Sequence, residues 1–307
     1  MTKRRGSRGV ALGSLITAVL ASTAHAQELE PRAYVNLPVG INFLVAGYAY
    51  SQGGMSFDPS LPVEDAHLKI HTAVIAYARS LNLWGQSGKV DVILPYSSLS
   101  GTALVSGVPR EREVDGLIDP RVRLSVNFYG APALSMADYA RYENDLVIGA
   151  SVQVGVPIGQ YDRTRAVNLG TNRWSIKPDI GFSKAFGAVT LDLTAGITYF
   201  GRNEDFFGGQ TVDQAPIYSM QGNLSYEFGR GVWGSLGATY YSGGRTTVNG
   251  VPKDNALSSS RAGLTLALPI DRSWSMKLHA SSGISARTGT NFDIVGFAVQ
   301  YRWLDGM

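Results

Sequence analysis

Apolar and polar side chains alternate strictly along several stretches of this chain. From Val189 to Tyr199 the odd-numbered residues are aliphatic or aromatic, whereas the even-numbered ones are Thr, Asp or Gly. The same period of two recurs over 146–156, 261–268 and 295–303. Because successive side chains of a β-strand point to opposite faces, this period predicts strands with an apolar environment on one side and a polar one on the other.

Extending this pattern along the chain predicts twelve strands. They lie near residues 41–50, 67–80, 88–98, 117–129, 145–157, 173–185, 189–200, 217–229, 231–242, 257–268, 273–285 and 292–303. The connections after the second, sixth, eighth and tenth strands are short, and most of the others are long and polar. An even number of strands with short turns at one end and long loops at the other is typical of bacterial outer-membrane barrels, whose short turns face the periplasm. The expected fold is therefore all-β, an antiparallel up-and-down transmembrane β-barrel.

One periplasmic connection is an exception to the short turns. The segment from Gly130 to Asn144 is long, and its sequence predicts a short helix with Ser135 as the N-cap.

The N-terminal residues predict export. Four basic residues precede an uncharged, mostly apolar run from Val10 to Leu20, and small residues follow up to Ala24-His25-Ala26. The run is too short for a membrane-spanning helix and has the features of a cleavable signal peptide. We therefore expect a signal peptide at 1–26, a periplasmic N-terminal segment at 27–40 and a barrel at 41–307. The expected location is the outer membrane of a Gram-negative cell.

Composition narrows the class of protein further. The chain has 27 Lys and Arg against 24 Asp and Glu, and removing the four bases of the signal leaves 23 against 24. This balance argues against a nucleic-acid partner, which requires clustered positive charge. No later run of about 20 apolar residues supports a helical span. A soluble β-sandwich would also show alternation, but it would not need systematically long and short connections.

The polar faces of the expected strands would line the barrel lumen. On lipid-facing positions the same charged groups would cost roughly 2–4 kcal/mol each at mid-membrane. Two interpretations remain open, a salt-bridge lattice that fills the barrel and a pore lining that selects solutes. The lumen-lining candidates are Arg121, Arg123, Gln153, Lys177, Asp179, Asp192, Arg261, Lys277, His279, Gln300 and Arg302.

Little in the sequence indicates catalysis. Three histidines follow the signal, and none has the spacing of a metal motif, so we expect neither a metal nor a cofactor. The enzyme alternative is an outer-membrane phospholipase, a twelve-stranded barrel with a Ser and a His on its outer surface. Here the alternation places His279 on the inner face beside Ser281 and Lys277, away from lipid. We therefore expect a protein that is not an enzyme.

Three segments resemble a known family. They are VPIGQYDRTRAVNLGTNRWSIKPDIGFSKAFG (156–187), DGLIDPRVRLSVNFYGAPAL (115–134) and KVDVILPYSSLSG (89–101). They resemble the outer-membrane family named for the meta-cleavage pathway of phenol degradation, whose members are described as transporters. The resemblance implies a channel or transporter for small hydrophobic or aromatic compounds. The alternative from another class is a closed structural or adhesion barrel without transport. The partners expected on this basis are outer-membrane lipid, the barrel-insertion machinery and small apolar or aromatic solutes.

The first of these segments contains a predicted extracellular loop. Its polar residues are expected either to hold the loop over or inside the barrel mouth, or to serve only as ordinary turn residues. The loop candidates are Tyr161, Asp162, Asn168, Asn172 and Arg173.

Overall fold

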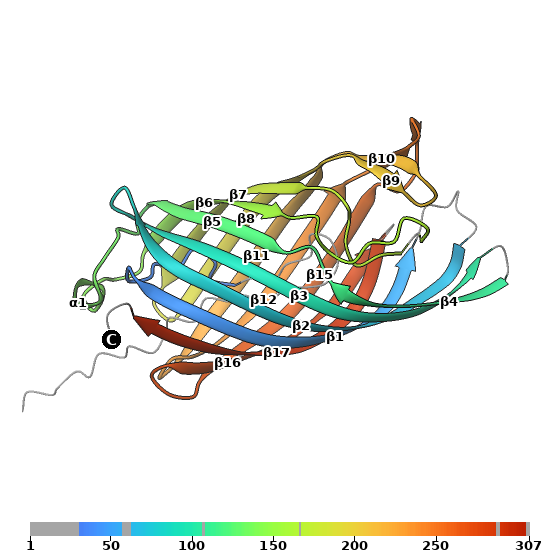
Figure 1. The fold of residues 1–307 in the computed structure, drawn as a ribbon. Helices are drawn as coiled ribbons and strands as arrows, with labels where there is room; N and C mark the ends of the chain where they lie inside the picture. The colour runs from blue at the N-terminus through green and yellow to red at the C-terminus, as the bar shows by residue number, and fades with distance from the viewer. Residues whose placement is uncertain (1–30, 57–62, 106–107, 166, 287–288, 305–307) are drawn as a thin grey trace, which may run out of the picture.

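A computed structural model describes residues 31–56, 63–105, 108–165, 167–286 and 289–304. In these residues a closed antiparallel barrel of twelve strands dominates the fold (Figure 1). β1 pairs with both β2 and β17, and the pairing of β2 with β3 completes the ring. The wall is formed by β1 (Ile41–Ser56), β2 (Val63–Leu83), β3 (Gln86–Val105), β4 (Val108–Leu117), β5 (Arg121–Tyr129), β6 (Leu146–Gly155), β7 (Ser175–Phe186), β8 (Val189–Phe200), β11 (Ile217–Gly229), β12 (Val232–Gly243), β15 (Leu257–Pro269), β16 (Trp274–Ala286) and β17 (Gly289–Leu304).

The expected fold class is confirmed, and each of the twelve predicted strands has a counterpart in the wall. The fourth, predicted at 117–129, corresponds to β5. β4 was not predicted and shares the same position in the ring, because both pair with β3. Ile118, Asp119 and Pro120 separate the two segments. Proline has no N–H to donate to a strand ladder, so regular pairing is interrupted there.

The two ends of the barrel differ in their connections. At one end, which we call the short-turn end, two residues separate β2 from β3, β7 from β8 and β11 from β12. The opposite end, the loop end, carries the segment between Val156 and Trp174 and a second sheet that the sequence did not predict. Within the described residues this sheet contains β9 (Asn203–Phe206), β10 (Gln210–Gln214), β13 (Thr246–Val248) and β14 (Val251–Pro252).

The long connection at the short-turn end contains the predicted short helix. It is α1 (Met136–Tyr139), and the Oγ of Ser135 accepts a hydrogen bond from the backbone N–H of Asp138, at 3.1 Å. This is the expected N-cap contact. Among the described residues, no helix is long and apolar enough to cross a membrane.

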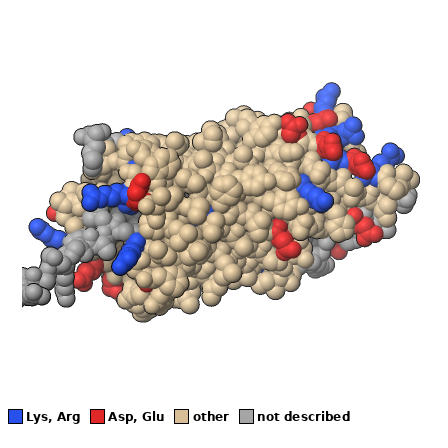
Figure 2. Space-filling model, turned by 90° about the horizontal axis from the view of Figure 1, so that it is seen from below, with Lys and Arg blue, Asp and Glu red and all other residues tan. Residues whose placement is uncertain are grey.

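The outer wall is apolar along its middle. Figure 2 shows most charged side chains gathered toward the two ends of the molecule, with a broad band between them that carries few. Exposed residues of this wall include Ile75, Leu124, Leu193, Met220 and Leu264. Aromatic rings border the band at the short-turn end, where Tyr301 lies against both Trp274 and Trp303. An apolar band with aromatic borders matches the lipid-facing surface of a membrane barrel.

The segment before β1 enters the barrel. Residues 31–40 belong to the predicted periplasmic segment 27–40, and the prediction did not include this insertion. Arg32, Tyr34, Asn36 and Leu37 are all buried within the short-turn end. The residues at 1–30, including the predicted signal peptide, lie outside the described residues.

Candidate functional site

The structure places all eleven lumen-lining candidates at inward positions of the wall. Arg123, Asp192, Arg261, Lys277 and Gln300 are buried. Arg121, Gln153, Lys177, Asp179, His279 and Arg302 are half-buried. Arg302 lies at the short-turn end, where its Nε donates to the carbonyl oxygen of Arg272 at 2.8 Å. The remaining candidates are distributed along the interior rather than gathered in one cluster.

One buried ion pair joins neighbouring strands near the short-turn end. Nε and Nη2 of Arg123 on β5 donate to the carboxylate of Asp91 on β3, with an Nη2–Oδ1 distance of 2.7 Å. The Nζ of Lys89 lies 3.8 Å from the same carboxylate. Asp91 is fully buried, so its charge depends on these partners. In this part of the interior the charged residues pair with one another, as expected for a salt-bridge lattice rather than for a pore lining.

The N-terminal segment is fixed in the interior by Tyr34. Its hydroxyl donates to Asp179, which also accepts a hydrogen bond from Ser151 at 2.8 Å. Glycines on the barrel wall make room for its ring, because a Cβ added to Gly181 would lie 1.9 Å from Cε2 of Tyr34. At Gly149 an added Cβ would lie 2.4 Å from Cδ1 of the same ring. Two neighbouring strands therefore form a socket for this tyrosine.

Arg32 provides a second attachment for the segment. Its backbone N–H donates to Asp192 on β8 at 3.2 Å, and its guanidinium carbon lies 5.3 Å from the ring centroid of Trp233. The Nζ of Lys277 lies 5.2 Å from the same ring. Two cations against one buried tryptophan form cation–π contacts in an environment that excludes water. The segment and these side chains fill the interior at the short-turn end.

The interior at the loop end contains an apolar cluster. Inward residues of β1, β2, β3 and β17 form it together with a residue of the loop 156–174, and neighbouring apolar side chains of the β4–β5 region and the same loop pack against it. The cluster consists of Ala49, Leu68, Ile70, Leu99, Leu169, Phe292 and Ile294, with Val114, Ile118 and Val167 against it. The members are buried against one another, so a solute that reached them would meet an apolar environment.

Asp119 holds the loop 156–174 against this cluster. Its carboxylate accepts hydrogen bonds from the backbone N–H groups of Gly159 and Thr171, at 2.9 and 2.8 Å, and from the hydroxyl of Thr171 at 2.6 Å. The two sides of the loop meet at Gly159 and Gly170, where an added Cβ on Gly170 would lie 2.8 Å from the carbonyl carbon of Gly159. The loop is therefore closed on itself and tied to the break between β4 and β5.

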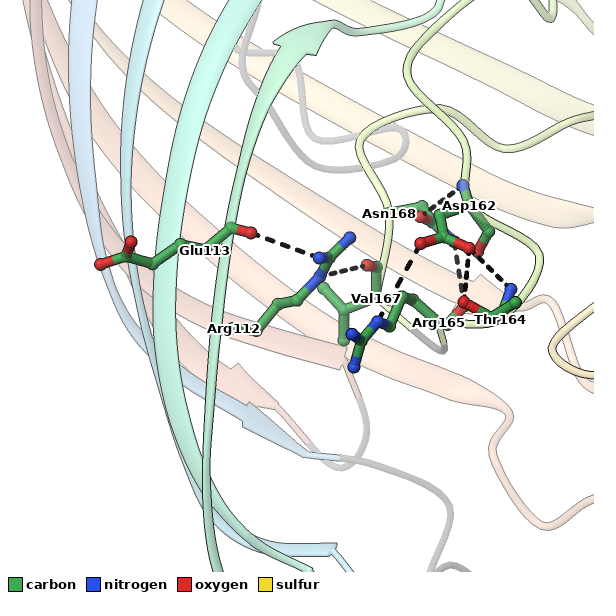
Figure 3. A network of polar contacts seen from close by, with 7 residues as sticks. All are labelled: Arg112, Glu113, Asp162, Thr164, Arg165, Val167 and Asn168. Atoms are coloured by element: carbon green, nitrogen blue, oxygen red, sulfur yellow. Dashed lines mark hydrogen bonds and ion pairs between the residues drawn. The ribbon is translucent and has the colours of Figure 1, made fainter.

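The predicted loop residues divide into two groups. Asp162 bonds within the loop, because its backbone N–H donates to Asn168 and its carboxylate accepts from Thr164. The hydrogen bonds from Thr164 hold the pKa of Asp162 below its usual value. Figure 3 shows this turn and the nearby Arg112 of β4, whose Nε donates to the carbonyl oxygen of Val167 at 3.3 Å. Asp162 and Asn168 thus act as turn residues.

The other predicted residues connect the loop to the second sheet. The Tyr161 hydroxyl donates to the carbonyl oxygen of Asp205 at 3.1 Å, and Asn172 donates to the side chain of Asn203 at 3.0 Å. Arg173 donates to Gln214 and lies over the ring of Phe200, 4.8 Å from its centroid. Burial lowers the pKa of Arg173 to about 10, so its guanidinium remains charged at neutral pH.

Several residues of the site were missing from the sequence-based candidates. Extending the alternation to the strand at 88–98 would have placed Lys89 and Asp91 on the inner face. Asp119 stands in one of the family-like segments, directly before a proline. No local pattern indicates Tyr34 or Arg32, because their partners are brought to them only by closure of the barrel.

His279 and Ser281, the pair considered for a phospholipase, both lie in the barrel interior. They are not joined by a hydrogen bond that would suit catalysis. Nδ1 of His279 is 3.4 Å from Oγ1 of Thr265, and the Oγ of Ser281 accepts from Arg261 at 2.9 Å. In the described part of the chain, no group of three or more His, Asp or Glu side chains is arranged to hold a metal ion.

The sequence comparisons identify the family. Residues 63–303 match the family described as the MetA-pathway of phenol degradation. The chain belongs to this family. The resemblance seen in the three sequence segments is therefore confirmed. A search of curated proteins found no match.

Solved structures of outer-membrane barrels share the fold. The COG4313 outer membrane channel from Pseudomonas putida F1 matches with 19% sequence identity and a TM-score of 0.77, over 90% of this chain and all of that one. The transport unit of the autotransporter AIDA-I from Escherichia coli matches with 8% identity and a TM-score of 0.52, over 95% of each chain. At these identities the likeness concerns the fold, which is that of an outer-membrane β-barrel.

Proposed function

We propose that this family member is an outer-membrane channel or transporter for small hydrophobic or aromatic compounds. The observation that carries the proposal is the apolar cluster inside the loop end, to which the loop 156–174 contributes Leu169. Six of its seven members stand at wall positions where an aqueous pore would need polar groups. Family membership supports the same class of solute, since the family description refers to phenol degradation.

Elementary energetics explains why such a lining suits these solutes. Burying an apolar side chain the size of Phe contributes roughly 1.5–3 kcal/mol, and a free aromatic ring leaving water gains a similar amount. A contact of this strength is weaker than the roughly 4 kcal/mol of a millimolar site, so the solute is readily released again. The apolar cluster would therefore concentrate such solutes at the mouth without trapping them.

Passage of a solute through the short-turn end requires a further step. Tyr34 and Arg32 occupy the interior there, so a solute travelling along the barrel axis would pass only when their segment moves. The same contacts favour the second candidate, a closed structural barrel without transport. The two candidates differ in whether the segment can be displaced while the wall stays folded.

Uptake by whole cells tests the proposal. A Gram-negative host with intact lipopolysaccharide would express the chain, and the initial rate of ¹⁴C-naphthalene accumulation would be compared with that of the empty vector. We expect faster uptake with the chain, and loss of most of the increase in Leu99→Asp, which places a charge in the apolar cluster. Ser98→Asp is the matched control, because Ser98 is the exposed neighbour on the opposite face of β3.

The folded band on a non-boiled gel shows that each variant has assembled, and Leu99→Ser provides a milder change at the same position. No increase in uptake by the wild-type chain would contradict the proposal and favour the closed barrel. Equal loss in Leu99→Asp and Ser98→Asp would exclude the apolar cluster as the route.

A further inference from the structure

The inner wall has two chemically different sides. The apolar arc comprises the inward cluster residues in the loop-end halves of β1, β2, β3 and β17, including Ala49, Ile70 and Ile294. The polar arc comprises the inward residues of β5, β6, β7, β8, β11, β12, β15 and β16. These eight strands follow one another without interruption around the ring, and so do the four of the apolar arc. The two arcs therefore face each other across the interior.

The polar arc is rich in hydroxyl and amide groups. Its buried members include Ser219, Asn223, Thr239, Ser259 and Ser281. Wall positions on the apolar arc at the loop end carry aliphatic or aromatic side chains instead. A solute with one apolar and one polar part would satisfy both sides at once, whereas a pure hydrocarbon would leave the polar arc without a match.

The polar arc carries charges of both signs. Three basic residues, Arg121, Lys177 and Arg261, stand toward the loop-end termini of β5, β7 and β15. Of the acidic residues, Asp179 lies only two positions beyond Lys177 on β7, and Asp192 lies in the short-turn half of β8.

The acidic residues already have partners from the N-terminal segment. Asp179 accepts from Tyr34 and Ser151, and Asp192 accepts from the backbone N–H of Arg32. Asp91, which lies beside the polar arc on β3, is paired with Arg123. The acids therefore already accept hydrogen bonds from protein groups, so the polar arc favours an anionic head over a cationic one.

The two arcs meet beside Arg261. Its Nη1 donates to Ser281 on β16, at 2.9 Å, and Ser281 is the register partner of Ile294 on β17. A cation and an apolar side chain thus lie within two strands of each other on the inner wall. This arrangement would let a polar head reach the guanidinium while the attached body lies on the apolar arc.

We propose that this barrel prefers amphipathic monoanions over neutral solutes, with a ring or short alkyl body on the apolar arc and one carboxylate directed to Arg261 and Lys177. This inference rests on the proposed transport function and narrows its substrate class. Hydrogen bonds between a guanidinium or ammonium group and a carboxylate are stronger than those with a neutral hydroxyl. The polar arc therefore discriminates by the charge of the head, and the apolar arc contributes affinity for the body.

Three probes that differ only in their head group test this inference. Purified protein in nanodiscs would be dialysed against 4-phenylbutanoate, 4-phenylbutan-1-ol or 4-phenylbutylamine, with empty nanodiscs as the blank. We expect the carboxylate to bind about tenfold more tightly than the alcohol, as one charge-assisted hydrogen bond allows, and the amine to bind most weakly.

Variants of the two basic residues sharpen the test. Arg261→Gln and Lys177→Gln should each reduce the preference for the carboxylate over the alcohol to about threefold or less, because half or less of the charge-assisted contact remains. Binding of the alcohol should stay nearly unchanged in both. Arg261→Lys should retain most of the preference, and Arg272→Gln, in an exposed short turn, should retain all of it. A folded band on a non-boiled gel shows that each variant has assembled. If Arg261→Gln does not assemble, the test relies on Lys177→Gln.

The outcomes separate this inference from the proposed function. Equal binding of the carboxylate and the alcohol, or tightest binding of the amine, would overturn the anionic class while leaving transport of apolar compounds intact. Binding of none of the three above the blank would contradict both.

Discussion

The two ends of the barrel interior are closed in different ways. At the loop end, the loop 156–174 packs Leu169 into an apolar cluster and is tied down by hydrogen bonds to Asp119. At the short-turn end, Tyr34 and Arg32 fit a socket of glycines, acids and a buried tryptophan. Apolar contacts are non-directional and accept many shapes, whereas hydrogen-bonded and charged contacts select one arrangement. The comparison indicates a loop end held by contacts that do not select one shape and a short-turn end held in one defined arrangement.

Breaking the ion pair at the short-turn end should have the largest effect. Asp91→Leu leaves Arg123 beside an apolar side chain, and loss of one partner of a buried pair costs about 3–5 kcal/mol. We expect the purified barrel to unfold at a clearly lower urea concentration. Unfolding is measured as loss of the folded band on a non-boiled gel. The double variant Asp91→Leu/Arg123→Leu should recover much of the loss. Unfolding of Asp91→Leu at the wild-type urea concentration would show that the pair contributes little to this end.

Releasing the loop tests the opposite end. Asp119→Ala removes the acceptor of three hydrogen bonds, a local cost of roughly 3 kcal/mol. Trypsin should then cleave the loop at the exposed Arg163 and Arg165 many times faster, while the urea midpoint of the wall stays close to that of the wild type.

Asp115→Ala is the control for the loop experiment, because this carboxylate on β4 accepts a hydrogen bond from Tyr96 rather than from the loop. Cleavage of Asp119→Ala at the control rate would show that other contacts hold the loop.

Displacing Tyr34 should open the short-turn end. Gly181→Ala places a Cβ where the ring now lies, and overpacking of this kind costs about 1–3 kcal/mol. The ring must leave its socket, so ion conductance in planar bilayers should rise above that of the wild type. Tyr34→Ala should give a similar rise, and the double variant should add little to either.

Gly222→Ala is the control for the socket, since its added Cβ would make only an ordinary contact, 3.4 Å from Leu193. A Gly181→Ala barrel that conducts no better than this control would contradict the assignment of Tyr34 as part of the closure.

The smallest expected effect concerns pH. Because the pKa of Asp162 is lowered in the folded loop, its ionised form stabilises the turn at neutral pH. That contribution is lost as pH falls below about 4 and through the folded pKa. Amide exchange at Thr164 should therefore be constant from about pH 5 to 8, after correction for intrinsic rates, and accelerate below about pH 4. Asp162→Asn should remove this pH dependence, and an unchanged profile in the variant would exclude Asp162 as its source.

The barrel wall was predictable from the sequence, whereas the contacts that close its two ends were only partly predictable. A period of two reports directly which residues share a face, so the strands and the inward position of residues such as Lys177 followed from local pattern. The partners of Tyr34 and Asp119 did not, because Asp179 and Thr171 lie 145 and 52 positions away along the chain. Such contacts depend on how the ring closes and on how a loop folds back. The apolar cluster was missed because the alternation is inverted at that level. The inward Ile70 and Ile294 stand next to the outward Lys69 and Asp293, so the apolar face that the pattern assigns to lipid is the inner one there.

The most direct test of the central claim is to find where an apolar aromatic solute lies in the barrel. A small photoreactive phenyldiazirine would be activated with the protein in nanodiscs, with and without excess naphthalene, and the labelled residues located by peptide mass spectrometry. We expect labelling of Leu99, Leu169 and Phe292 that naphthalene suppresses, alongside labelling of outward residues such as Met220 that it does not. Labelling confined to outward residues, or inner labelling that naphthalene leaves unchanged, would contradict a solute route through the interior.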